Sequence, residues 1–175
     1  MRVEIRHRFE GATLREVEEL YLLDDEFNRA TFERMGYTRK VVTHTLEGDA
    51  FERTLHLCPH KPLPAPFSAL VPSGMFHIIE QIHYDFRTHT GTWRTTPSVL
   101  GKQFRAEGPL RIEESDGAIV FRLEGDVSAS IPLLSRRAEK QAVATAESQH
   151  EALARAVREQ LAAAQRATSY AFISA

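Results

Sequence analysis

Polar and apolar residues alternate from the start of the chain. Val3, Ile5, His7 and Phe9 share one face, and an arginine or a glutamate occupies each position between them. A period of two residues is typical of a strand with one buried and one solvated face. The pattern therefore predicts a half-buried β-strand over residues 2–9.

Two short helices should follow this strand. Thr13 and Glu16 have the spacing of a capping box, and apolar residues recur after them at helical intervals. A second helical stretch begins near Asp24 or Asp25 and should end at Gly36, because glycine commonly terminates helices.

Six further β-rich segments follow, and most are joined by hairpin-length connections. They cover residues 37–46, 51–58, 75–87, 92–96, 103–113 and 118–128. The strongest turn signal is the Asp116-Gly117 step, a preferred pair in tight hairpins. Strands joined by short turns run in opposite directions, so we expect a strongly curved antiparallel sheet of about seven strands.

Residues 59–74 interrupt the strands with five of the eight prolines of the chain. Proline has no N–H group to donate to a sheet, so this segment should be a loop or a lid. Its prolines Pro62, Pro64, Pro66 and Pro72 surround the apolar residues Leu63, Phe67, Leu70 and Val71. Such a loop could act as a gate, contact a partner, or simply pack across the open end of the sheet.

The end of the chain has a helical period instead. From Leu133 to about Gln165 there is neither glycine nor proline, and alanine is abundant. One stripe recurs every three to four residues and comprises Leu134, Ala138, Ala142, Thr145, Gln149, Leu153, Val157 and Leu161. We expect one long amphipathic helix packed on the sheet. Residues 166–175 show no period and should form a C-terminal tail after a single α+β domain of residues 1–165.

Composition excludes several classes of protein. The chain of 175 residues has 22 basic and 24 acidic residues mixed along its length, so no basic stripe indicates nucleic-acid binding. No run of 18 apolar residues predicts a transmembrane segment, and the first residues lack the apolar core of an export signal. The single cysteine, Cys58, rules out an intramolecular disulfide and fits the cytoplasm. The chain could be a monomer or a homodimer.

Several stretches and their order carry a family resemblance. They are VEIRHRFEGATLREVEELYLLDDEF, RTLHL, GPLRIEESDGAIVFRLEGDVSASIPLL and the alanine-rich helix after them. Over residues 1 to about 162 the chain resembles the helix-grip fold of the START-like superfamily, also called SRPBCC or Bet v 1-like. It is most similar to the DUF2505 family of uncharacterised bacterial proteins. The resemblance implies a cavity between sheet and helix, which in relatives holds lipids, sterols or polyketides. It carries over no catalytic residues, because function belongs to the site and not to the fold.

Alternation also predicts which side chains face that cavity. The inward set on the strand near residue 80 is Phe76, Ile78, Glu80, Ile82, Tyr84 and Phe86, and on the strand near residue 55 it is Phe51, Arg53, Leu55 and Leu57. Glu80 and Arg53 are the charged exceptions. A buried charge must be paired or solvated, so they should meet each other, a water molecule or a polar ligand group. Alternatively, twist or a bulge leaves one of them at the rim.

The histidines suggest no metal site. His56, Cys58 and His60 alternate along one strand, but zinc needs three or four converging ligands and this spacing matches no standard pattern. Cys58 lacks the orienting group and oxyanion signal of a nucleophile, and His77 and His83 should be solvated on the outer face. We therefore expect no metal, no cofactor and no catalytic residues.

The favoured function is non-catalytic binding or carriage of a hydrophobic or amphipathic small molecule. The predicted ligand-binding residues are Phe51, Arg53, Leu55, Phe76, Ile78, Glu80, Ile82, Tyr84 and Trp93. Tyr84 and Trp93 could instead be ordinary core aromatics. Two other functions stay open. One is a cyclase, dehydratase or hydrolase that uses Glu80 or an inward histidine, and the other is an interaction protein with a filled core.

Overall fold

The computed structural model describes residues 1–71 and 74–173, with side chains as far as Ser169. The strands are β1 (Arg2–Glu10), β2 (Tyr37–Glu47), β3 (Ala50–Pro59), β4 (Ile78–Asp85), β5 (Thr90–Pro97), β6 (Phe104–Ser115) and β7 (Ala118–Ala129). The helical elements are α1 (Leu14–Glu18), the π-helical turn η1 (Glu19–Leu23), α2 (Asp25–Arg34), the 3₁₀ turn η2 (Phe67–Ala69) and α3 (Ser135–Ile173). The predicted α+β class and order of elements are confirmed.

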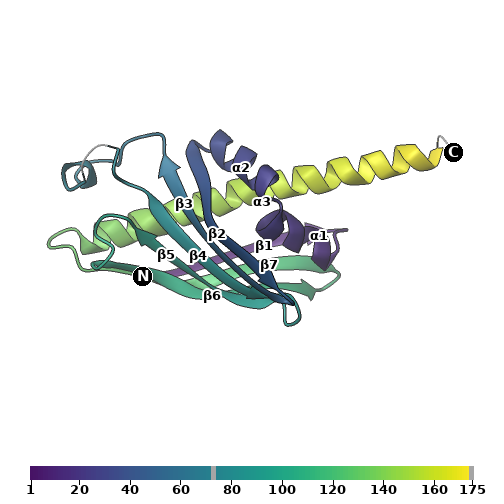
Figure 1. Cartoon of the computed structure of the whole chain (residues 1–175), viewed down its shortest axis with the longest axis horizontal. Coiled ribbons are helices and arrows are strands. Elements are labelled where there is room, and N and C mark those ends of the chain that lie inside the picture. Colours follow the sequence, from purple (N-terminus) through teal and green to yellow (C-terminus); the bar gives the residue numbers. More distant parts are fainter. Residues whose placement is uncertain (72–73, 174–175) are drawn as a thin grey trace.

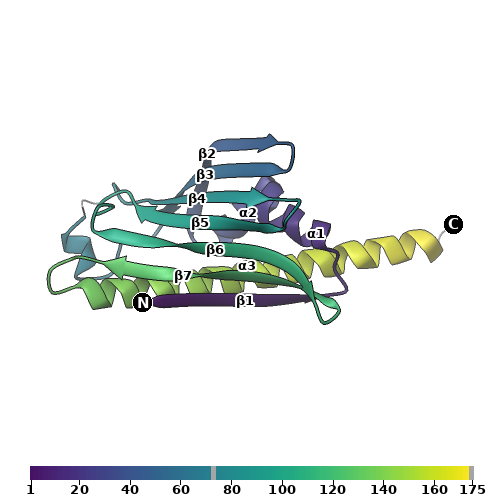
Figure 2. The ribbon, with the colours of Figure 1, turned by 90° about the horizontal axis from the view of Figure 1, so that it is seen from below.

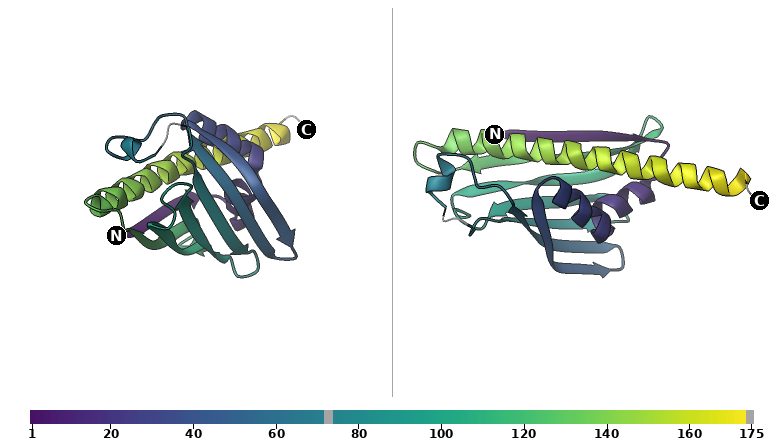
Figure 3. Two further views of the ribbon diagram at one scale, coloured as in Figure 1. Left: turned by 60° about the vertical axis from the view of Figure 1, so that its left-hand side comes forward. Right: turned by 90° about the horizontal axis from the view of Figure 1, so that it is seen from above.

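The strands of the described chain form one antiparallel sheet of seven strands in the order β1-β7-β6-β5-β4-β3-β2. Figure 1 shows the sheet curving around α3, and Figure 2 shows its other face without a covering helix. In Figure 3, α1, α2 and α3 lie on the same side of the sheet. The concave face is thus the face that the apolar side chains of the strands share.

Glycines allow the sheet to bend. A Cβ atom on Gly108 would lie 2.0 Å from the Glu124 carbonyl oxygen, and one on Gly125 would lie 2.7 Å from Trp93. Glycine in a strand interior commonly marks such a close approach of backbone or side chain. These two residues face each other across β6 and β7, where the Trp93 indole crosses and donates a hydrogen bond to the Glu124 carbonyl at 2.9 Å.

The local signals of the sequence are realised in detail. Thr13 and Glu16 form the capping box of α1, with Glu16 Oε2 accepting from the Thr13 backbone N–H at 2.7 Å. Asp24 caps α2 through the Phe27 backbone N–H at 2.8 Å. The Asp116-Gly117 turn has positive φ at both residues, as a type I′ hairpin requires. The π-helical turn η1 between the two helices was not predicted.

The long helix differs from its prediction at both ends. It was expected from Leu133 to about Gln165 and is observed from Ser135 to Ile173. Residues 166–173, expected to be an irregular tail, therefore continue the helix, and Figure 1 shows this end of α3 running past the sheet. The division of the chain into domain and tail at residue 165 stays a prediction.

The proline-rich segment contains no strand in its described part, residues 59–71 and 74, apart from the last residue of β3. Phe67 and Val71 are buried, whereas Leu70 is exposed. Phe67 packs against Ala138 at the start of α3, and Arg137 donates a hydrogen bond to the Ala65 carbonyl at 3.1 Å. Pro72 lies outside the described residues. None of the helices that the structure describes is long and apolar enough to cross a membrane.

Candidate functional site

A cavity of about 570 Å³ lies between the concave face of the sheet and α3. The sheet lines it with apolar side chains such as Leu55, Ile78 and Leu123. Residues of the proline-rich segment, including Leu63 and Phe67, line one end of it. An internal space with mainly apolar walls is therefore present where the sequence predicted one.

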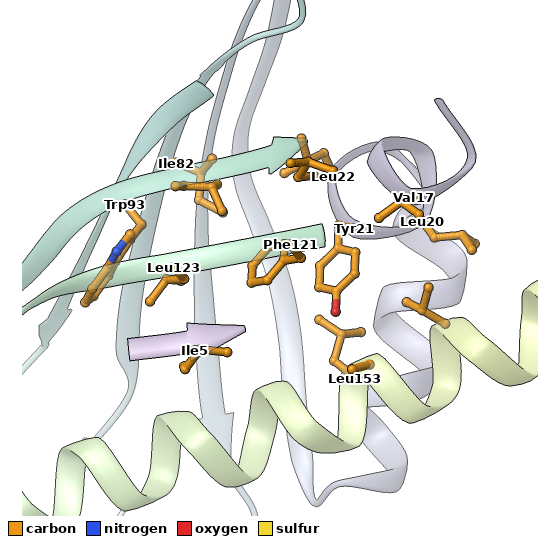
Figure 4. Close-up of a cluster of buried hydrophobic side chains, with 14 of the residues drawn as sticks. Ile5, Val17, Leu20, Tyr21, Leu22, Ile82, Trp93, Phe121, Leu123 and Leu153 are labelled. Atoms are coloured by element: carbon orange, nitrogen blue, oxygen red, sulfur yellow. The ribbon is translucent and has the colours of Figure 1, made fainter. Parts of the chain in front are cut away.

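The sizes of the α3 side chains explain where the cavity lies. Near its start the helix presents Ala138, Ala142 and Ala146 to the cavity, at intervals of one helical turn. Further along, Leu153 and Val157 are buried against the sheet and fill the space. Figure 4 shows Leu153 in that filled region, close to the first helices. The change from small to large side chains on one helix face thus separates a hollow half from a solid half.

Seven of the nine predicted ligand-binding residues line the cavity. They are Arg53, Leu55, Phe76, Ile78, Glu80, Ile82 and Trp93. Their placement agrees with the predicted inward faces of β3 and β4, while their role in binding stays a prediction.

Phe51 and Tyr84 do not line the cavity, so their prediction as cavity walls was wrong. They are register partners near the β3–β4 end of the sheet, and Phe86 packs edge-on against both rings. The Tyr84 hydroxyl donates to Glu18 at 2.8 Å, on the helix above it. Alternation correctly gave the face of each residue, but it carries no information about which part of that face a helix covers.

Arg53 and Glu80 meet in the cavity wall. Arg53 Nη2 lies 3.3 Å from Glu80 Oε1, and Arg53 Nη1 donates to the Leu22 carbonyl at 3.0 Å. The Arg53 side chain is 5% exposed and that of Glu80 is 22% exposed. Burial lowers the pKa of Arg53, and the Glu80 carboxylate opposes that shift. The internal ion pair, one of the arrangements expected from the sequence, is therefore the observed one.

Three polar atoms at the cavity have no hydrogen-bond partner among the described residues. They are Tyr21 Oη, Gln149 Nε2 and His150 Nδ1, each buried and each on a residue that lines the cavity. The Tyr21 ring stacks on Phe121 with centroids 4.4 Å apart, and the His150 ring lies over Phe121 at 5.5 Å. In Figure 4 the Tyr21 hydroxyl points toward α3 beside Leu153, one turn after His150. We call Tyr21, Gln149 and His150 the unpaired cluster.

The surroundings of this cluster keep it uncharged. Burial lowers the pKa of His150 to about 4, and the neighbouring His7 adds to that effect, so the ring is neutral at pH 7. Burial also raises the pKa of the Tyr21 hydroxyl, which keeps its proton. Neutral hydrogen-bonding groups thus face the cavity at this place.

The sequence analysis missed the unpaired cluster, although one signal was available. Thr145 and Gln149 are polar residues within the otherwise apolar stripe of α3. A polar residue in a core-facing stripe needs a partner, and this rule could have drawn attention to Gln149 and to its neighbour His150.

The histidines near Cys58 do not form a larger group. The His56 and His77 rings lie 4.4 Å apart, and His60 Nε2 is 3.0 Å from the Thr38 hydroxyl. Cys58 is partly buried, and His83 is exposed beside Glu52. His77 is only partly exposed, against the expectation of a solvated ring, because it packs on His56. Within residues 1–71 and 74–173, no three potential metal ligands converge.

A curved antiparallel sheet that holds a long C-terminal helix, with two short helices after its first strand, defines the helix-grip fold. The family model described as "Protein of unknown function (DUF2505)" matches residues 4–163, so the chain belongs to the DUF2505 family. No curated protein matches the chain.

Solved structures with low sequence identity share the fold. TTHA0849 from Thermus thermophilus has a TM-score of 0.61 and 16% identity, and the match covers 94% of this chain and 99% of that one. Protein Ms6760 from Mycobacterium smegmatis has a TM-score of 0.59 and 13% identity, covering 91% and 90%. Ara h 8.0201 has a TM-score of 0.56 and 10% identity, covering 93% and 98%. These likenesses place the chain in the START-like, or Bet v 1-like, fold, and they concern the fold alone.

Proposed function

We propose that this protein binds a hydrophobic or amphipathic small molecule in its internal cavity and holds it without chemical change. The observation that carries the proposal is the cavity of about 570 Å³ with largely apolar walls. Its volume lies within the range of roughly 300–1,000 Å³ that is typical of small-molecule sites. Leu55, Ile78, Ile82 and Trp93 would contact the apolar part of such a ligand.

The cavity favours this function over that of an interaction protein, which would need a filled core. Two observations also favour binding over catalysis. Glu80 is engaged by Arg53, and a general base works best when its pKa is near the working pH, whereas that of His150 is about 4.

Binding can be tested with a neutral, environment-sensitive dye, N-phenyl-1-naphthylamine, whose fluorescence rises in apolar surroundings. We expect saturable dye binding that the variant Ala146→Trp abolishes, because the indole would fill the cavity. Ala163→Trp is the matched control, since Ala163 is exposed further along the same helix.

Native mass spectrometry of the protein purified from its own host would show whether it carries a discrete small molecule. The absence of both saturable dye binding and any bound mass would contradict the proposed function. Equal dye binding by wild type and Ala146→Trp would move the binding site away from this cavity.

A further inference from the structure

The unpaired cluster brings neutral polar groups from two separate elements to one part of the cavity. Tyr21 comes from η1, whereas Gln149 and His150 come from α3. Tyr21 and His150 both pack on the Phe121 ring, which fixes them near each other. Each residue lines the cavity, and each has a buried polar atom with no partner among the described residues.

Such atoms are rare in folded proteins, because a buried donor or acceptor without a partner has lost its water and gained nothing in return. Polar residues elsewhere in this fold do find partners. Asn28, for example, donates from its side-chain amide to the Leu20 carbonyl at 2.7 Å and the Asp24 carbonyl at 2.8 Å. Three unpaired groups around one cavity therefore indicate that the occupant of the cavity supplies their partners.

The charges of the lining indicate what kind of group this occupant presents. Arg53 is paired with Glu80, and Arg39 is paired with Asp25 at 3.0 Å. Lys61 is exposed on the proline-rich segment rather than buried beside the cluster. Among the described lining residues, no buried charge is left to neutralise a charged ligand group, and burying one without a partner is costly.

The chemistry of the cluster further limits the ligand group. The Gln149 side-chain nitrogen can only donate, the Tyr21 hydroxyl can donate or accept, and a neutral histidine offers one donor and one acceptor. An oxygen atom that accepts hydrogen bonds satisfies all three, and a hydroxyl oxygen can also donate to His150. An alcohol or a carbonyl group has these properties.

We propose that the ligand is an amphiphile whose uncharged oxygen, of an alcohol or a carbonyl group, hydrogen-bonds to Tyr21, Gln149 and His150. Its apolar body then lies along Ala146, Ala142 and Ala138 toward the proline-rich segment. This inference rests on the proposed function, because it names the class of ligand for the same cavity.

A matched series of probes tests the inference: 1-dodecanol, dodecanoic acid and dodecylamine, which share a chain and differ in the charge of the head group at pH 7. Each is titrated against protein saturated with N-phenyl-1-naphthylamine. We expect 1-dodecanol to displace the dye at a concentration at least about tenfold lower than either charged amphiphile, because a charged head group would be buried unpaired.

Two variants locate the head group. Tyr21→Phe and Gln149→Leu should each weaken displacement by 1-dodecanol about fivefold, the usual effect of one lost hydrogen bond, and leave dodecanoic acid unchanged. Thr145→Val is the matched control, because Thr145 lines the cavity one turn earlier on α3 and is not among the unpaired groups. Circular dichroism checks that each variant is folded, and either variant alone suffices for the comparison.

The outcomes separate the two proposals. If the dye binds but the charged amphiphiles displace it as well as 1-dodecanol or better, the inference is overturned and the proposed function stands. The same holds if 1-dodecanol is preferred but neither variant weakens it. If neither the dye nor any of the three amphiphiles binds, both proposals fail.

Discussion

Two tyrosines on the concave face of the sheet are equally buried and differ in one respect. Tyr84 is 3% exposed and Tyr21 is 4% exposed. The Tyr84 hydroxyl donates to Glu18 at 2.8 Å, and His89 Nδ1 lies 2.7 Å from the same carboxyl oxygen. The Tyr21 hydroxyl has no partner among the described residues. The filled end of the interior satisfies its polar groups within the protein, whereas the hollow end leaves some of them to another molecule.

The contrast arises from what packs above each tyrosine. Over Tyr84, α1 brings a carboxyl group into the interior, so the hydrogen bond is internal. Beside Tyr21, α3 changes from Leu153 to the smaller Ala146 and Ala142, and the space that opens contains no protein partner among the described residues. A buried polar group without a partner is thus most informative where it borders a cavity.

The largest predicted effect comes from creating an unpaired group where the structure has none. Glu80→Leu leaves the Arg53 guanidinium buried without its carboxylate, and we expect the free energy of unfolding to fall by about 3 kcal/mol. The double variant Arg53→Met with Glu80→Leu should recover most of that loss, since both charges are then absent. Urea unfolding of the wild type, the two single variants and the double variant measures the effect.

A loss below about 0.5 kcal/mol for Glu80→Leu would contradict this prediction, because that is the range of ordinary surface substitutions. It would mean that Arg53 reaches water through the cavity and that the pair is not needed to hold it.

The sequence predicted the sheet well because its signals are local. Alternation, the capping box at Thr13 and the Asp116-Gly117 turn each need only a few neighbouring residues, and each is found as expected. Alternation likewise placed Arg53 and Glu80 on the inner face. The position of Phe51 and Tyr84 outside the cavity depends on where α1 and η1 cover the sheet, which is a non-local property.

The missing period after Gln165 was misleading for a related reason. An apolar period reports that a helix has a packing partner, whereas helix formation itself depends on backbone propensity. Residues 166–173 contain no glycine and no proline and follow an alanine-rich helix, so α3 continues although it has passed the sheet. The unpaired cluster was missed because hydrogen-bond partners cannot be counted before the chain is folded.

The second effect concerns pH at the hollow end. The unfolded chain protonates His150 near its ordinary pKa of 6.5, but burial lowers the pKa in the folded protein to about 4. The unfolded state therefore binds more protons between these values. The stability from a neutral His150 is fully present above about pH 6.5 and is lost as the pH falls toward 4.

At pH 4.5 this loss should be about 2 kcal/mol relative to pH 7. Burial lowers the pKa of His7 in the same direction, so the wild type alone does not isolate His150. The measurement is the change in unfolding free energy between pH 7 and 4.5, compared with that of His150→Leu, which should lose about 2 kcal/mol less. His83→Gln is the control, because His83 is exposed and should behave as the wild type does. Identical pH dependence of His150→Leu and the wild type would show that His150 is not held neutral.

The smallest effect tests the two tyrosines directly. Tyr84→Phe leaves the buried Glu18 carboxyl group without one of its hydrogen bonds, so we expect the unfolding free energy to fall by about 1.5 kcal/mol. Tyr21→Phe removes a hydroxyl that has no partner in the described structure, so the ligand-free protein should stay within about 0.5 kcal/mol of the wild type. Both substitutions delete one oxygen from an equally buried ring, which makes each the control for the other in parallel urea titrations. If Tyr21→Phe cost as much as Tyr84→Phe in the ligand-free protein, Tyr21 would already have a partner, and the hollow end would not differ from the filled one.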